Sequence, residues 1–133
     1  MLSILPELFF LKLLAPTLLR VVIAVFLLFT ARFMLLKKKN ISATRIPIVG
    51  HVPEWAVLIS SLLICLVAGL LFIGAWTQVA AIVGAIISLK HAYAARYYST
   101  IVPFEVSTYL LMFCICLSLI VTGAGAFAFD LPL

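Results

Sequence analysis

Long apolar runs separated by short polar segments dominate the hydrophobic pattern of this chain. The runs cover residues 15–36, 55–74, 77–97 and 106–127, and each has about the 20 residues that a helix needs to cross a bilayer. They are apolar on all sides and do not alternate with polar positions, so they predict helices and not strands. The pattern therefore predicts an all-α membrane protein, a four-transmembrane-helix bundle forming a single membrane domain over residues 1–133.

Breaker residues indicate where the runs are connected. Residues 40–54 carry Pro47, Gly50 and Pro53, and residues 99–105 carry Pro103, so we expect irregular linkers there. No charged residue occurs from 55 to 89, a stretch too long for one span. Its polar interruption at residues 74–78 predicts a tight turn between the second and third helices.

Small side chains recur four residues apart in three of the runs. Such spacing places them on one helix face, and small residues let helices pack closely in lipid. We expect these rows to face the interior of the bundle. They are Ala80, Gly84, Ser88 and Ala92; Cys114, Ser118, Thr122 and Ala126; and Ser61, Cys65 and Gly69.

Composition and charge indicate the surroundings of the chain and its orientation in the membrane. The chain is 67% hydrophobic and 10% charged, with mean hydropathy +1.38, so we expect the lipid bilayer as its surroundings. Apart from Arg20 and Arg32, nearly all Lys and Arg lie in residues 37–54 and 90–105. Basic loops stay on the cytoplasmic side, which puts both termini on the extracytoplasmic side. We interpret the run of lysines at 37–39 as an orientation signal against anionic lipid, and expect no nucleic-acid partner.

Two arginines inside the first apolar run are the main candidates for a polar site. An Arg at mid-depth costs about 2.5 to 3.5 kcal/mol on insertion scales. Arg20 is level with Asp130 at the end of the fourth run, and we expect the two to pair. Arg32 is level with Glu54 and Glu105, either of which could be its partner. The alternative is that both arginines extend to the headgroups unaided.

Other candidate chemistry is sparse. Cys65, Cys114 and Cys116 fall in apolar runs, and a helical Cys-x-Cys points its thiols about 200° apart, which disfavours a disulfide or shared metal. A thiol relay to quinone stays open. His91 has only His51 as further histidine, so the sequence predicts no metal site. There is no phosphate loop, zinc signature, nucleophile elbow or haem motif, and no cofactor is evident.

Several short motifs follow one another in order along the chain. They are Ala15-Pro16 followed by Leu18-Leu19-Arg20; Gly74, Thr77, Ala80 and Ala81; His91; and the segment from Thr122 to Asp130. Taken together, they resemble the DoxX family of small bacterial membrane proteins over roughly residues 15–130. One segment differs, since Phe29-Thr30-Ala31-Arg32 stands where the family usually has a Gly and a Lys.

The resemblance implies an integral protein of the bacterial inner (plasma) membrane. It would be an accessory or anchor subunit of a membrane-associated oxidoreductase complex, quinone-linked or tied to oxidative-stress defence, without catalysis by this chain alone. Its partner would be a soluble or membrane oxidoreductase subunit, and Arg20, His91 and Asp130 would line a quinone-accessible cleft. Two alternatives stay open: a homo-oligomeric carrier of a small molecule or lipid, and a structural partner of another membrane protein.

Overall fold

The computed structural model describes residues 8–46 and 50–123, with side chains from residue 14 onwards except residue 46. This part of the chain is mostly helical. In chain order the elements are α1 (Leu8–Leu36), α2 (Lys38–Ala43), β1 (Arg45–Ile46), β2 (Gly50–His51), α3 (Glu54–Ile73), α4 (Thr77–Tyr97) and α5 (Val106–Thr122).

Three helices of the described chain, α1, α3 and α4, are long and apolar enough to cross a membrane, and α5 is a shorter apolar helix. The prediction of a helical protein of the multi-pass membrane type agrees with this. At 1.5 Å per residue, the 17 residues of α5 extend about 26 Å, slightly less than the roughly 30 Å hydrocarbon core.

The structure differs from the predicted elements at two helix ends and in one linker. The first helix starts at Leu8 and continues through Pro16, which costs one backbone hydrogen bond. The last helix stops at Thr122, where Gly123 has a φ of 74°. Residues 40–54, expected to be irregular, contain the end of α2 and a two-residue antiparallel strand pair in which Arg45 lies opposite His51.

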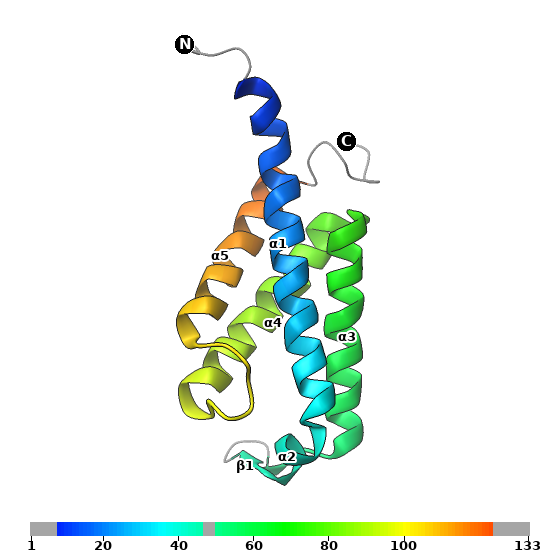
Figure 1. Cartoon of the computed structure of the whole chain (residues 1–133), viewed down its shortest axis with the longest axis vertical. Helices are drawn as coiled ribbons and strands as arrows, with labels where there is room; N and C mark the ends of the chain where they lie inside the picture. Colours follow the sequence, from blue (N-terminus) through cyan, green and yellow to red (C-terminus); the bar gives the residue numbers. More distant parts are fainter. Residues whose placement is uncertain (1–7, 47–49, 124–133) are drawn as a thin grey trace.

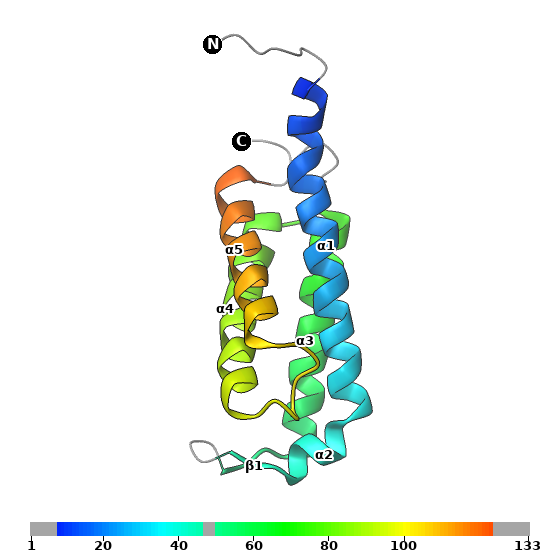
Figure 2. The same ribbon diagram turned by 60° about the vertical axis from the view of Figure 1, so that its left-hand side comes forward.

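The long helices run alternately up and down beside one another (Figures 1 and 2). The most extensive contacts join α1 to α3 and α4 to α5, with further contacts between α3 and α4 and between α1 and α5. We call the end that holds residues 74–76 the turn end. The opposite end, which holds α2, the strand pair and residues 98–105, is here called the basic end.

The tight turn predicted between the second and third runs is confirmed. Gly74 has a φ of 78°, and its amide donates to the Leu70 carbonyl at 2.8 Å. Trp76, with a φ of 52°, also adopts the left-handed conformation before α4 begins. Glycine reaches this conformation without the steric cost of a Cβ, so Gly74 suits the first residue after α3.

The predicted inner faces are right for one helix and wrong for two. On α4 all four residues of the row are buried. On α5, Cys114 and Thr122 are exposed and Ser118 is half-buried, while Ala126 lies outside the described residues. On α3, Ser61 is buried but Cys65 is exposed. The residues that α5 actually buries are larger: Tyr109, Met112, Cys116 and Leu119.

Gly84 explains why larger residues are needed. A Cβ built on Gly84 would lie 3.2 Å from the Cys116 Sγ and 3.9 Å from the Cδ1 atoms of Leu27 and Leu71. Side chains from α1, α3 and α5 therefore meet at a position of α4 that has no side chain. Where one helix presents bare backbone, its neighbours must supply the volume that fills the interior.

The Gly84→Ala variant should be less stable by about 1 to 3 kcal/mol, the usual cost of overpacking, because its methyl would crowd the Cys116 sulfur. Thermal unfolding in detergent measures this. Adding Cys116→Ala should recover part of the loss. Gly69→Ala is the control, since no atom lies within 4 Å of a Cβ there. A Gly84→Ala protein as stable as Gly69→Ala would contradict this packing.

Candidate functional site

Arg20 forms the centre of a buried polar site at the turn end. Its side chain is only 2% exposed, although it is charged and lies in an apolar helix. The guanidinium lies against Gly74, where an added Cβ would come within 2.6 Å of Arg20 Cζ and 2.9 Å of Nη2. Thr77, in the first turn of α4, is fully buried at the same end. Gly74 therefore both forms the turn and leaves room for the arginine.

Asp130, the predicted partner of Arg20, lies outside the described residues. The pairing of these two residues therefore stays a prediction.

A second buried polar cluster lies nearer the basic end. It combines Thr30 of α1, Ser88 and His91 of α4, and Tyr109 of α5. Backbone carbonyls accept from two of the hydroxyls: Thr30 Oγ1 donates to Phe26 at 3.0 Å and Ser88 Oγ donates to Gly84 at 2.8 Å. These bonds satisfy polar groups within their own helix, as membrane interiors require.

His91 and Tyr109 join α4 to α5 within this cluster. His91 Nδ1 is 2.8 Å from the Ile87 carbonyl, which can only accept, so Nδ1 carries a proton. The ring centroids of His91 and Tyr109 are 5.5 Å apart. The Tyr109 hydroxyl lies beside Thr30 and the Phe104 backbone, without a hydrogen bond of standard geometry to a described residue. The arrangement is suited to holding helices together.

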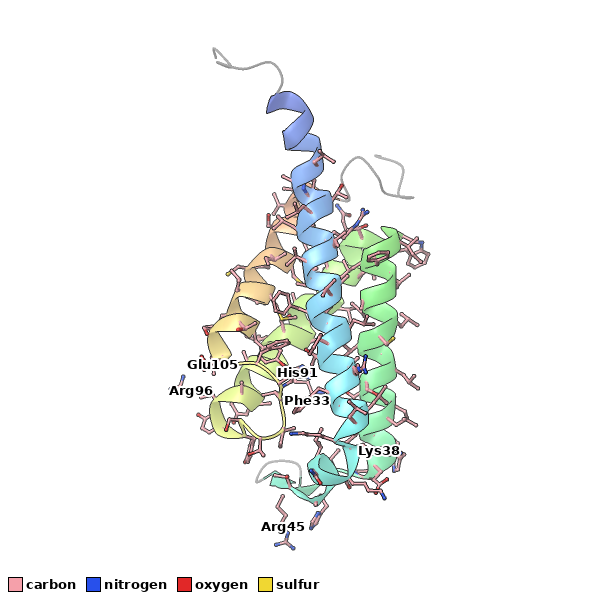
Figure 3. The ribbon with its side chains drawn as sticks, viewed as in Figure 1. Phe33, Lys38, Arg45, His91, Arg96 and Glu105 are labelled. Carbon is pink, nitrogen blue, oxygen red and sulfur yellow. The ribbon has the colours of Figure 1, made fainter. Side chains whose placement is uncertain are left out.

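Arg32, Glu54 and Glu105 are all exposed at the basic end. Within the described part of the chain, Arg32 forms no ion pair with either acid, and its side chain is on the outside of the bundle. Figure 3 shows Lys38, Arg45, Arg96 and Glu105 in the half of the molecule that contains α2. Three basic side chains there have partners. Lys37 lies 4.7 Å from the Phe33 ring centroid, Lys90 Nζ donates to Ser60 Oγ at 3.4 Å, and Arg45 Nε donates to His51 Nε2 at 3.3 Å.

Arg20 and His91 lie at different levels of the bundle. Arg20 is beside the turn that precedes Thr77, whereas His91 is roughly four helical turns, or about 21 Å, farther along α4. One small headgroup could not contact both side chains. The cleft that the resemblance implies would therefore need to be long, with His91 and Arg20 at opposite ends.

Two open cavities lie beside Phe104 at the basic end. The larger, of about 470 Å³, is lined by Ala95, Ser99, Val102, Pro103, Phe104, Glu105, Val106 and Ser107. The smaller, of about 190 Å³, is lined by Val25, Phe26, Phe29 and Phe104. The Phe104 ring packs against Phe26 and Tyr109, at centroid distances of 5.3 and 6.1 Å.

The described residues contain no group of three or more His, Cys, Asp or Glu placed to bind a metal. Cys65 and Cys114 are exposed and Cys116 is buried, and all three are free thiols. Cys114 and Cys116 thus point to different sides of α5, as the helical geometry predicts.

Sequence reasoning missed Thr30, Tyr109 and Phe104. Thr30 is a polar residue in the middle of an apolar run, which is a usable signal. Tyr109 lies near the start of the fourth apolar run and Phe104 in the linker before it, and neither position gives a signal of its own. Only their long-range contacts distinguish them.

Comparisons of this chain with protein-family models, curated proteins and solved structures found no match.

Gly74→Ala should destabilise the protein more than Gly50→Ala does. Both glycines have a similar positive φ, 78° and 76°, so both substitutions carry the same backbone strain of about 1 to 2 kcal/mol. Only at Gly74 would the new methyl also displace Arg20, because nothing lies within 4 Å of a Cβ at Gly50. Thermal unfolding of both variants measures the difference. Equal losses would show that Arg20 does not lie against Gly74.

Proposed function

We propose that this chain is a DoxX-like protein of the bacterial inner membrane that anchors, or serves as accessory subunit to, a membrane-associated oxidoreductase complex. The observation that carries the proposal is the site at the turn end. Two of the motifs behind the resemblance, the Arg20 motif and the Gly74 to Ala81 motif, are distant in sequence, yet Arg20 lies against Gly74. Thr77, Ala80 and Ala81 are buried close by along α4.

The surface of the bundle supports an anchoring role. Large apolar side chains are exposed on every long helix, for example Phe29, Leu66, Ile86 and Leu111, at 58% or more of their full exposure each. We propose that these faces contact lipid, and that α5 is the fourth span. Outside α1, α3, α4 and α5 the described chain offers only α2, the strand pair and short connections for a partner to bind.

The proposed orientation places the basic end in the cytoplasm. The exposed or half-buried basic residues that support it are Arg32, Lys37, Lys38, Lys39, Arg45, Lys90 and Arg96. Bacterial membrane proteins keep such residues on the cytoplasmic side. Both termini would then be extracytoplasmic.

Purification in a mild detergent tests the anchoring role. An oxidoreductase subunit, with or without quinone, should copurify with the wild-type chain. Arg20→Leu should lower the membrane level and thermal stability, because a buried charged group would be replaced by a residue that cannot make its interactions. A stable isolated chain, with neither quinone nor partner, would contradict the proposal. Uptake of an anionic solute into proteoliposomes would instead favour the carrier.

Cysteine labelling tests the orientation. With Cys65, Cys114 and Cys116 replaced by Ala, the variants Gln78→Cys and Lys39→Cys carry single exposed thiols at the turn end and the basic end. An impermeant maleimide should label Gln78→Cys in intact cells and Lys39→Cys only after permeabilisation. Labelling of both positions from one side would refute the four-span arrangement.

A further inference from the structure

The larger cavity beside Phe104 combines a carboxylate with apolar walls. Glu105, Ser99 and Ser107 provide its charged and hydroxyl groups and are all exposed, while Ala95 and Val102 are buried beneath them. Its volume of about 470 Å³ is within the range of small-molecule sites. The cavity is therefore open to the surroundings on a polar rim and closed by an apolar floor.

The smaller cavity borders the apolar surface of α1 and shares one lining residue with the larger cavity. Phe104 lines both cavities, and the second is otherwise bounded by Val25, Phe26 and Phe29. Val25 and Phe29 are 52% and 61% exposed, so this cavity opens on the face that we assign to lipid. The larger cavity, here called the polar recess, and the smaller cavity, here called the apolar groove, share Phe104. Together they match a molecule with a polar head and a hydrocarbon tail.

The charged residues at the larger cavity determine which kind of lipid headgroup fits it. Glu105 is the N-cap residue immediately before α5. Its side chain makes no capping hydrogen bond, and it forms no ion pair with a described residue. Its carboxylate would repel an anionic headgroup and can accept hydrogen bonds from an ammonium. Arg96 is in the same helical turn as Ala95 of the cavity wall, and Figure 3 shows it on the same flank as Glu105. A cation at Glu105 and a phosphate toward Arg96 would be complementary to both.

We propose that the two cavities beside Phe104 form a binding site for a phospholipid with a primary ammonium headgroup. The ammonium binds the Glu105 carboxylate, Ser99 and Ser107 donate to headgroup oxygens, and an acyl chain lies in the groove of Val25, Phe26 and Phe29. This inference rests on the proposed four-span arrangement, because that arrangement places Glu105 at the headgroup level.

Native mass spectrometry of the purified chain tests the site, with phosphatidylethanolamine, phosphatidylcholine and phosphatidylglycerol of identical acyl chains as probes. The wild type should bind the ethanolamine lipid about two- to fivefold more tightly than the others, the range that one exposed ion pair supports. Glu105→Gln should abolish this preference. Glu54→Gln is the matched control, an exposed acid at the same end that does not line the cavity, and should retain it.

A second pair of variants tests the groove. Val25→Trp should fill it and weaken binding of all three lipids, whereas Leu28→Trp, at an equally exposed position of α1 outside the cavity, should not. The proposal is overturned if Glu105→Gln keeps the wild-type preference, if the wild type prefers the anionic lipid, or if the two tryptophan variants behave alike. Labelling of Gln78→Cys and Lys39→Cys reports the span arrangement separately, so a failed lipid site and a failed topology are distinguishable.

Discussion

Close packing around α4 is the constraint on which the rest of this structure depends. Lipid is as apolar as leucine, so helices in a membrane gain little from burying apolar surface and must instead fit closely. Small residues along α4, with Gly84 at the centre, let Leu27, Leu71 and Cys116 reach it from three helices. This packing also sets the positions of the two polar clusters. Along α4, one cluster lies on the turn-end side of Gly84 and the other on the basic-end side.

The two clusters differ in what they offer to function. The polar atoms of His91, Ser88 and Thr30 bond to backbone carbonyls of their own helices, as expected of residues that stabilise a bundle. Arg20 brings a charge into a buried position beside a glycine whose backbone conformation also forms the turn. A charge kept there at such cost is the stronger sign of a functional requirement.

The sequence predicted those features that depend on a single helix or turn. The turn at Gly74 and the inner face of α4 followed from local chemistry, since every residue of that face is small. The inner faces of α3 and α5 did not, because spacing alone cannot show that a slim helix requires bulky partners such as Met112 and Leu119. Arg20 stood out as a charge in an apolar run, whereas its contact with Gly74 depends on how α1 meets the α3–α4 turn.

Disulfide formation in native membranes tests the central packing most directly. In a chain with Gly84→Cys that keeps Cys116 but has Cys65 and Cys114 replaced by Ala, mild oxidation should form an intramolecular disulfide between α4 and α5, because the Cβ position of residue 84 is 3.2 Å from the Cys116 Sγ. Mass spectrometry of the digested protein would identify the linked peptides. A chain that keeps Cys114 in place of Cys116 should stay reduced. Equal or preferential linkage to Cys114 would contradict the arrangement of helices described for this protein.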